Sequence, residues 1–343
     1  MKIEIITTPN EALKETGFGT LKACHSILNS IKKVGHIVDI TICKTISDLE
    51  KVKQRKPDLV LLAVKYLEIE DGENIYLSKY FEENKINFSG SFRDSIKFDS
   101  DKVLAKSHLK SKGINTAKYF TALPKEYKRV YDLPVRFPLF LKPIDAANGN
   151  GIDDLSFVNN FDEFEKKVAS LYERFAMPVL VEEYLDGPEF TTAIIKKTDG
   201  ELLVAALEVI PLESKKGLRI LGEKAKQDDT EKLRKIEDSK LKESIIKLAI
   251  DVFIDLDIRD FGRIDIKTNK SGVCFFMEAN LVPGMTYGSS YFPKAFEIEH
   301  SLDYDSVIKL IVDEGISRVS RVIEPVIEYV EIDCSIEKKV EVV

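Results

Sequence analysis

The sequence predicts an α/β protein with an N-terminal parallel sheet and more than one domain. Near the start of the chain, short β-rich runs alternate with a helical pattern, the order from which parallel sheets are built. The chain has 343 residues, which exceeds one average domain, and 44% of them are hydrophobic. We therefore expect two or three domains with sizeable cores.

The first unit supplies the β-rich runs KIEIIT, HIVDITI and DLVLLAV, and its helical pattern begins near Leu21. Open parallel sheets place ligands beyond the carboxyl ends of their strands, so the loops Thr7 to Thr20 and Lys65 to Asn74 should border one site. Gly17 and Gly19 lie in the first loop. A lone Gly-x-Gly favours a simple turn over a dinucleotide-binding fingerprint.

A second unit begins near Asp99. A helical segment runs through DKVLAKSHLKSKGI and ends at Gly113, a residue suited to helix termination. The runs FPLFLKPI and PVLVEEYL then predict two buried strands, and they flank AANGNGI, the most glycine-rich loop of the chain.

The last third of the chain predicts one long helix and a strand pair. Residues Asp238 to Leu256 carry an apolar stripe at helical spacing, and an aspartate cap begins it. FGRIDIKT and GVCFFMEA then form paired strands joined by a turn through Asn269 to Gly272. The final PVIEYVEIDCSIEKKVEVV alternates apolar and charged residues, which is typical of an edge strand or a tail packed on a neighbour.

Composition and charge argue against several classes of partner. The net charge is -7 and the basic residues are dispersed, so a groove for nucleic acid has little support. No stretch approaches the roughly 18 apolar residues that a membrane span needs, and the first residues lack the features of a signal peptide. We expect a soluble, cytoplasmic protein that acts on small molecules.

The cysteines and histidines indicate no metal centre. The chain has no Cys-x-x-Cys pair and no histidine at metal-ligand spacing from a cysteine. We expect reduced, structural thiols at Cys24, Cys43, Cys274 and Cys334.

Three sets of residues predict a nucleotide site. The first is Lys142 with the loop Ala146 to Gly151, whose small residues let backbone amides approach phosphate oxygens. By itself this pattern favours an ordinary glycine turn. The second lies in VLVEEYLDGPEF, where carboxylates can accept hydrogen bonds from an adenine amino group and from ribose hydroxyls. A solvated acidic hairpin explains this segment equally well.

The third set is the most specific. Arg263 and Asp265 stand in GRID, and Glu278 and Asn280 stand in MEAN, which is followed by PGMT. If the two strands pair, the two carboxylates and the asparagine carbonyl supply hard oxygen ligands for Mg²⁺ on nucleotide phosphates. Arg263, with amides near Gly284, can stabilise an oxyanion at a carbonyl under attack. A surface ion-pair cluster is the alternative.

The motifs LFLKP, VLVEEYLDGPEFT, FGRIDIKT and FMEANLVPGMT, with SGS and DKVLAK upstream, resemble the D-alanine–D-alanine ligase branch of the ATP-grasp superfamily. The resemblance covers residues 1–319 and implies an ATP-grasp fold of three domains, with ATP between the second and third. We assign 1–97 to an N-terminal α/β domain, 98–186 to a central domain, 187–322 to a C-terminal domain and 323–343 to an extended tail.

The resemblance also implies roles for single residues. Phosphates would be held by Lys102, Lys142 and the loop residues Asn148, Gly149 and Gly151. Adenine and ribose would contact Glu182, Glu183, Leu185 and Glu189. Two Mg²⁺ ions, with Mn²⁺ as an alternative, would bind Asp265, Glu278 and Asn280, and Arg263 and Gly284 would form the oxyanion site.

A lid over the phosphates is implied at Pro211 to Asp228, with Lys224 as its phosphate contact, although such charged runs are usually solvated loops. The donor carboxylate would attack the γ-phosphate of ATP, and the amine would then displace phosphate from the acyl phosphate. Ser289 or Ser290 would bind a carboxylate of the amine substrate. Capping of a local helix explains these serines equally well.

The donor pocket departs from the family pattern. D-alanine ligases present His-Gly-x-x-Gly-Glu-Asp-Gly, whereas this chain has KYLEIEDG. Lys65 therefore replaces the histidine, and only Glu70, Asp71 and Gly72 match the family pattern. These changes should narrow the pocket and add a formal charge. Glu11 or Glu15 remains available to bind an ammonium group. The serine pair of the phosphate loop is replaced by Asn148 and Gly149, so the donors there would be mainly backbone amides.

These observations predict a carboxylate–amine ligase with an altered donor pocket that uses ATP and magnesium. The alternatives are a genuine D-alanine–D-alanine ligase and a non-catalytic nucleotide-binding regulator, and the intact third set argues against the regulator. An NAD-dependent reductase is poorly supported because no complete glycine fingerprint follows the first strand. The expected partners are amino-acid-like carboxylate and amine substrates, with no nucleic acid and no membrane; the resemblance also implies a homodimer.

Overall fold

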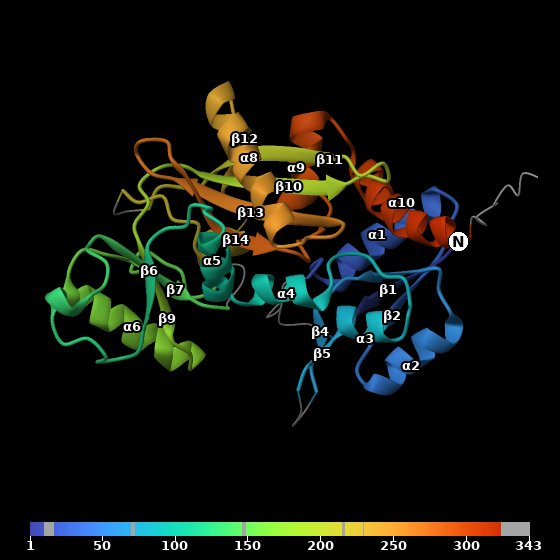
Figure 1. The fold of residues 1–343 in the computed structure, drawn as a ribbon, viewed down its shortest axis with the longest axis horizontal. Helices are drawn as coiled ribbons and strands as arrows, with labels where there is room; N and C mark the ends of the chain where they lie inside the picture. Colours follow the sequence, from blue (N-terminus) through green and yellow to red (C-terminus); the bar gives the residue numbers. More distant parts are fainter. Residues whose placement is uncertain (10–16, 70–72, 146–148, 215–216, 229, 324–343) are drawn as a thin grey trace, which may run out of the picture.

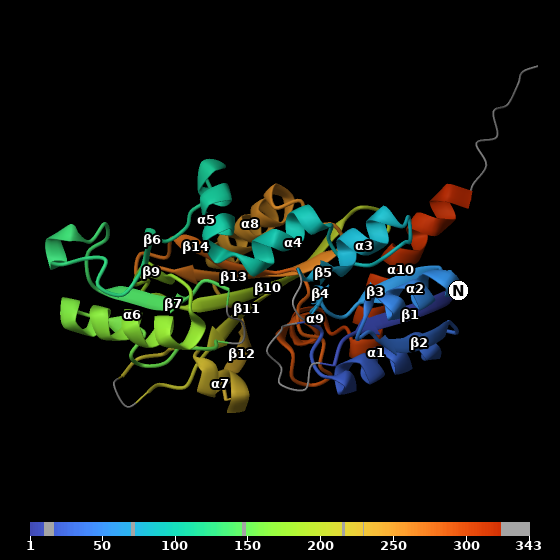
Figure 2. The same ribbon diagram turned by 90° about the horizontal axis from the view of Figure 1, so that it is seen from below.

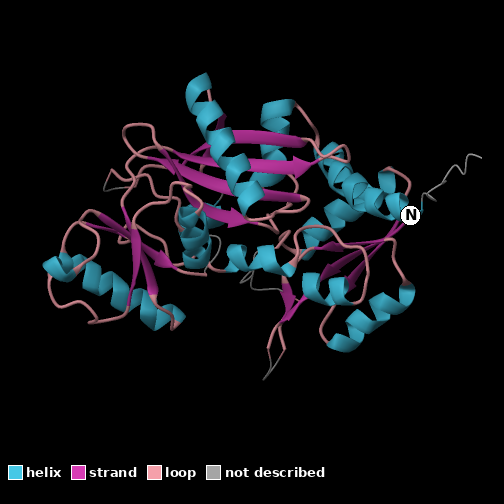
Figure 3. Ribbon diagram, in the orientation of Figure 1, coloured by secondary structure: helices cyan, strands magenta, loops and turns pink. Residues whose placement is uncertain are grey.

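The computed structural model describes residues 1–9, 17–69, 73–145, 149–214, 217–228 and 230–323. Its elements form three units along the long axis of the molecule (Figure 1). The N-terminal unit lies on the right of Figure 1, the central unit on the left, and the C-terminal sheet above and between them. Figure 3 shows the strands of the three units as separate sheets.

The N-terminal unit contains the predicted parallel sheet. Its strands are β1 (Lys2–Thr7), β2 (Ile37–Ile42) and β3 (Leu59–Leu62), in the order β2-β1-β3. Around it lie α1 (Leu21–Lys33), α2 (Ile46–Arg55), α3 (Leu77–Glu83), α4 (Arg93–Ser100) and the hairpin of β4 (Tyr66–Leu67) and β5 (Ile75–Tyr76). Every residue of β3 is buried, which explains why its sequence is apolar throughout instead of alternating.

The central unit is a four-stranded antiparallel sheet with the order β6-β9-β7-β8. Its elements are β6 (Tyr119–Ala122), the 3-10 helix Val130–Asp132, β7 (Leu139–Pro143), β8 (Phe157–Val158), α6 (Phe161–Phe175) and β9 (Val179–Glu183). The predicted strands FPLFLKPI and PVLVEEYL are confirmed as β7 and β9. Phe164 and Val168 of α6 join Leu139 and Leu141 of β7 in one apolar core.

The C-terminal unit is a five-stranded antiparallel sheet with the order β12-β11-β10-β13-β14. Its strands are β10 (Glu189–Lys196), β11 (Leu202–Ile210), β12 (Lys232–Lys235), β13 (Phe261–Thr268) and β14 (Cys274–Asn280). Its helices are α7 (Glu223–Asp228), α8 (Ser239–Asp255), α9 (Tyr291–His300) and α10 (Tyr304–Ile323). α8 covers one face of the sheet and α9 the other (Figure 2), so six consecutive residues of β10 are buried.

The predicted helix boundaries are confirmed by their caps. α5 (Lys102–Ser111) follows Asp101, whose carboxylate accepts a hydrogen bond from the Leu104 amide. Asp238 caps α8 in the same way, with the Leu241 amide as donor. These bonds satisfy amide groups that have no partner inside the helix.

α10 carries the chain back to the N-terminal unit, where it packs against α1 (Figure 1). The tail predicted at 323–343 lies almost wholly outside the described residues, as does Cys334. The other three cysteines are free and buried, as expected. Among the described residues, no helix is both long and apolar enough to span a membrane.

Candidate active site

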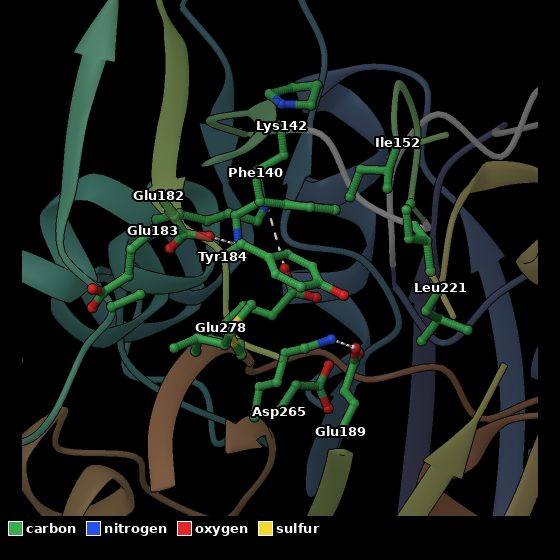
Figure 4. Close-up of a pocket in the computed structure, with 18 of the residues that line it drawn as sticks. Phe140, Lys142, Ile152, Glu182, Glu183, Tyr184, Glu189, Leu221, Asp265 and Glu278 are labelled. Carbon is green, nitrogen blue, oxygen red and sulfur yellow. Dashed lines mark hydrogen bonds and ion pairs between the residues drawn. The ribbon is translucent and has the colours of Figure 1, made fainter. Parts of the chain in front are cut away.

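A pocket of about 900 Å³, part of it open to solvent, lies between the central and C-terminal sheets. Figure 4 shows polar side chains from β7, β9, β10, β13 and β14 around a common space, whereas the Glu183 carboxylate points away from it. The predicted nucleotide residues that line it are Lys102, Lys142, Gly149, Glu182, Glu183, Leu185, Glu189, Asp265 and Glu278. Residues far apart in the sequence are therefore gathered in one place.

Glu182 is the centre of a buried ion-pair group. On β9 it is only 1% exposed, and its two carboxylate oxygens lie 2.5 Å from Lys106 Nζ and 2.8 Å from Lys142 Nζ. Burial by itself raises the pKa of Glu182, but the two lysines outweigh it and hold the pKa at about 2. Glu182 therefore stays charged and fixes the Lys142 ammonium at the edge of the pocket (Figure 4).

The chain segment after Glu182 forms the next wall of the pocket. The Glu183 carboxylate accepts a hydrogen bond from the Lys118 amide, and the Leu185 side chain is buried. Glu189, at the start of β10, lies 3.5 Å from Lys267 Nζ. Apolar side chains from both sheets and from the segment before α7 complete the wall: Ala117, Phe140, Ile152, Ile220, Leu221 and Met277.

The pairing of β13 with β14 brings the third predicted set together. Arg263 lies opposite Asn280, and Asp265 lies opposite Glu278. Arg263 forms a two-pronged contact with Asp265, with Nε 3.0 Å from Oδ1 and Nη2 2.9 Å from Oδ2. Thr191 and Asn280 also donate hydrogen bonds to Asp265, at 2.8 and 3.3 Å.

This arrangement fixes the charges of the set. Burial by itself lowers the pKa of Arg263, but the ion pair with Asp265 raises it above its ordinary value. Burial raises the pKa of Glu278, whereas Lys102 and Lys142 lower it, and the net value is about 2. Lys102 Nζ lies 3.6 Å from the Glu278 carboxylate. At neutral pH the site therefore presents the charged Glu278 carboxylate beside Lys142, whose pKa is raised because nearby carboxylates outweigh its burial, and beside Lys102, whose pKa burial lowers.

The donor set of Asp265, Glu278 and Asn280 fits a magnesium ion bound together with phosphates. Mg²⁺ prefers oxygen ligands and commonly takes one or two carboxylates, with phosphate oxygens and waters completing its shell. The two carboxylates line the pocket between the central and C-terminal sheets, where the nucleotide was predicted to bind. Among the described residues, no group of three or more histidine, cysteine, aspartate or glutamate side chains is placed to hold a metal without phosphate.

The loop after β14 carries Gly284 and the two predicted serines. Ser290 accepts a hydrogen bond from the Thr286 amide at 2.8 Å, so its hydroxyl shapes the turn before α9 but does not cap the helix. A Cβ atom on Gly284 would lie 2.8 Å from Ser290 Oγ, which explains why glycine occupies this position. Ser289 lies in the same turn.

The two loops beyond the parallel sheet do border this region. The Phe18 amide donates to the Ala63 carbonyl, and the Met285 amide donates to the Phe18 carbonyl, both at 2.8 Å. Gly17 is required for a close approach and not only for a turn, since a Cβ atom there would lie 1.9 Å from the Ala63 oxygen. Predicted substrate contacts at Glu11, Glu15 and Glu70 lie outside the described residues.

Lys65 has a buried partner that sequence reasoning missed. Its ammonium lies 2.9 Å from Asp99 Oδ1, and both side chains are almost fully buried. Asp99 Oδ2 accepts hydrogen bonds from the Leu281 and Val282 amides, at 2.6 and 3.3 Å. The formal charge expected of Lys65 is therefore matched by Asp99, and the pair ties the N-terminal unit to the loop before Gly284.

The segment over the pocket contributes Lys226, and Lys224 does not line the pocket. Lys226 of α7 is a pocket residue, whereas Lys224 is exposed to solvent. Arg174 of α6 holds this segment through two contacts with Glu223, at 2.9 and 3.0 Å. Gly149 packs directly under it, because a Cβ atom there would lie 2.9 Å from the Gly222 carbonyl carbon.

Gly151 donates its amide to Glu223, whereas Asn148 lies outside the described residues. Two residues beside the pocket, Lys106 and Lys226, were not predicted from the sequence, which carries only a weak signal for each. Lys106 follows Lys102 by one helical turn, which places both on one face of α5. Lys226 stands in the same lysine-rich run as Lys224, and sequence spacing does not choose between them.

Comparison with known proteins places these features in context. Residues 108–313 match the family described as "D-ala D-ala ligase C-terminus". A D-alanine--D-alanine ligase of Aquifex aeolicus is 28% identical over 85% of this chain and 94% of its own length. D-alanine--D-alanine ligase B of Clostridium perfringens is 28% identical over 93% of this chain and 99% of its own length.

Solved structures show the same fold. The D-alanine--D-alanine ligase of Bacillus anthracis complexed with ATP superposes with a TM-score of 0.71, at 22% identity, over 94% of this chain and 98% of the other. The VanG D-Ala:D-Ser ligase of Enterococcus faecalis gives a TM-score of 0.70, at 20% identity, over 92% and 99%. The three-unit architecture is thus the ATP-grasp fold of these ligases.

Proposed function

The chain belongs to the D-alanine–D-alanine ligase family, and from this premise we propose that it is an ATP-dependent ligase that joins a carboxylate to an amine through an acyl phosphate. The observation that supports the proposal most is the pairing of β13 with β14. It sets Arg263, Asp265, Glu278 and Asn280 opposite one another beside a pocket that contains lysines.

ATP is the proposed first substrate. Its adenine lies between the apolar walls around Phe140, Leu221 and Met277, with the backbone from Glu183 to Leu185 along the purine edge. Glu189 binds the ribose. Glu182, whose oxygens are taken by two lysines, acts on the nucleotide through Lys142.

The phosphates extend toward Lys102, Lys142 and Lys226. The backbone amide of Gly149 adds a neutral donor, whereas the Gly151 amide is held by Glu223. Asp265, Glu278 and Asn280 are the proposed holders of Mg²⁺, which neutralises phosphate charge when it is bound. We favour Lys226 over Lys224 as the lid contact, because only Lys226 lines the pocket.

The reaction proceeds in two steps. A donor carboxylate oxygen attacks the γ-phosphorus of ATP, the bond from that phosphorus to the β–γ bridging oxygen breaks, and ADP leaves. The amine nitrogen then attacks the acyl carbon, the bond to the phosphate oxygen breaks, and the amine loses a proton. Arg263, held in place by Asp265, and an amide near Gly284 stabilise the oxyanion that forms between these events.

The donor is expected to differ from D-alanine or to bind differently. Lys65 and Asp99 occupy, as a buried pair, the place where family members carry histidine. A genuine D-alanine–D-alanine ligase remains the second candidate, because relatives covering most of the chain bear that name. The homodimer and the cytoplasmic location stay predictions.

The test is ATP turnover by the full-length chain with magnesium. ADP and phosphate release would be measured with D-alanine alone and then with a panel of D- and L-amino acids, singly and in pairs, with products identified by mass. Turnover confined to D-alanine indicates the second candidate. Turnover with other acids supports an altered donor pocket. ATP binding without turnover across the whole panel would mean a non-catalytic nucleotide-binding protein.

A further inference from the structure

Glu231 presents a buried carboxylate oxygen that nothing in the described structure satisfies. The residue stands directly before β12, and its Oε1 accepts a hydrogen bond from the Tyr291 hydroxyl. Its Oε2 is buried and has no hydrogen-bond partner among the described residues. A buried polar atom left in this way costs on the order of 1–3 kcal/mol, and each such atom in a native structure calls for an explanation, such as a bound ligand, ion or water.

The neighbours of Tyr291 place Glu231 at the active site. The guanidinium carbon of Arg263 lies 5.5 Å from the centroid of the Tyr291 ring, and Lys226 Nζ lies 5.2 Å from it. Arg263 is the proposed oxyanion residue, and Lys226 lines the nucleotide pocket. Tyr291 also directly follows Ser290, the residue beside the Gly284 loop. Tyr291 therefore connects Glu231 to a residue of the proposed oxyanion site and to a lysine of the pocket.

The two cations beside the Tyr291 ring have other roles in the proposed site. Arg263 is paired with Asp265 through two contacts. Lys226 faces the space that the ATP phosphates would fill. Tyr291 stays neutral, because burial and the hydrogen bond to Glu231 raise its pKa. A neutral hydroxyl donates one hydrogen bond to Glu231 but supplies no positive charge.

We infer that Glu231 binds a positively charged group on the amine substrate, so that the acceptor is an amino acid whose side chain carries an ammonium or guanidinium group. The inference rests on the proposed ligase function and names the class of its second substrate. A cation of this kind gives Glu231 Oε2 a charge-assisted hydrogen bond. D-alanine has no such group.

A structural role for Glu231 is the competing explanation. Glu231 follows the segment that carries α7, so its bond to Tyr291 of α9 could simply hold that segment down. The two roles separate in Glu231→Gln. Glutamine still accepts the Tyr291 hydrogen bond through its amide oxygen but carries no charge. A role in holding the segment is therefore preserved in this variant, whereas binding of a cation is lost.

The experiment compares ornithine with norvaline, an uncharged amino acid of nearly the same shape, as acceptors in ATP turnover. Both stereoisomers of each would be used, with D- and L-alanine as donors. Ornithine should exceed norvaline in kcat/KM by about tenfold or more. Glu231→Gln should remove that preference by lowering kcat/KM with ornithine to about the value for norvaline. Glu237→Gln, the same substitution at an exposed position nearby, should change neither.

Titration calorimetry compares the binding of ornithine with that of norvaline directly, and it does not require the donor acid to be known. Enzyme loaded with a non-hydrolysable ATP analogue and magnesium should bind ornithine more tightly than norvaline, and Glu231→Gln should bind the two alike. Equal use and equal binding of both amino acids by the unaltered enzyme would overturn the inference, as would an equal loss for both in Glu231→Gln. Turnover with norvaline would still support the ligase function. No turnover with any pair of donor and acceptor would refute both the ligase function and the role of Glu231.

Discussion

At the scale of single residues, Asp265 organises the proposed reaction centre. Arg263, Thr191 and Asn280 all donate to its carboxylate. These contacts leave the Arg263 side chain little freedom, because two of its nitrogens are bound in a fixed geometry. A donor held in place before the reaction stabilises a developing oxyanion without reorganisation. Glu278, on the opposite strand, has a side chain 30% exposed and faces the pocket.

Glu278→Gln should suppress ATP turnover roughly 100-fold or more while the fold persists. The substitution keeps the side-chain size but removes a proposed metal charge and the ion pair with Lys102. Turnover would be measured at saturating magnesium, with circular dichroism as the check on folding. Glu243→Gln on the exposed surface of α8 is the control. Near-normal turnover in Glu278→Gln would contradict the metal assignment.

At the scale of elements, α5, β7 and β9 are joined by one carboxylate. Lys106 of α5 is fully buried, pairs with Glu182 of β9, and donates to the Phe276 carbonyl of β14 at 3.2 Å. Lys142 of β7 takes the other oxygen of Glu182. This group therefore links the central sheet to the C-terminal sheet and sets the position of a pocket lysine.

Lys106→Met should lower the free energy of unfolding at neutral pH by roughly 1–3 kcal/mol, because Glu182 loses one of its two partners. The pKa of Glu182 is about 2 in the folded protein, below its ordinary 4.5. Its stabilisation is therefore complete above about pH 4.5 and is lost as the pH falls toward 2.

The difference in unfolding free energy between the unaltered protein and Lys106→Met should therefore become smaller as the pH falls from about 4.5 toward 2. Urea denaturation at a series of pH values measures it. Lys110→Met, on the exposed side of the same helix, is the control. A difference that stays constant from pH 6 to the lowest pH at which both proteins fold would disprove the charge-based explanation.

At the scale of the whole molecule, Asp260 joins α10 to the N-terminal unit. It is 1% exposed, accepts two contacts from Arg318 of α10 at 2.8 and 3.1 Å, and accepts the Gly90 amide at 2.7 Å. Arg318 also donates to the Phe88 carbonyl. Three parts of the chain that are distant in sequence therefore depend on one buried carboxylate.

Asp260→Asn should destabilise the protein by about 3 kcal/mol, since it removes the buried carboxylate that Arg318 and Arg259 both contact and leaves Arg318 only its longer 3.6 Å contact with Glu314. The denaturant midpoint should fall for probes in the N-terminal and C-terminal units together. Asp257→Asn, the same change at an exposed residue three positions earlier, should have little effect. A loss confined to α10, with the rest of the molecule unaffected, would show that Asp260 does not couple the units.

The sequence by itself determined the parallel strands of the N-terminal unit, the helices α1, α5 and α8, the strands β7, β9, β13 and β14, and the facing acidic pair. The parallel strands, the capped helices and the β13–β14 hairpin follow from local periodicity, because burial alternates with the pitch of each element. Since both strands were predicted with their turn, the approach of Asp265 to Glu278 followed too. Only the tertiary structure decided the partners of Lys65, Glu182 and Glu231, and the choice of Lys226 over Lys224. These contacts join residues from separate units and loops, and their distances depend on how the units pack, which no local pattern encodes.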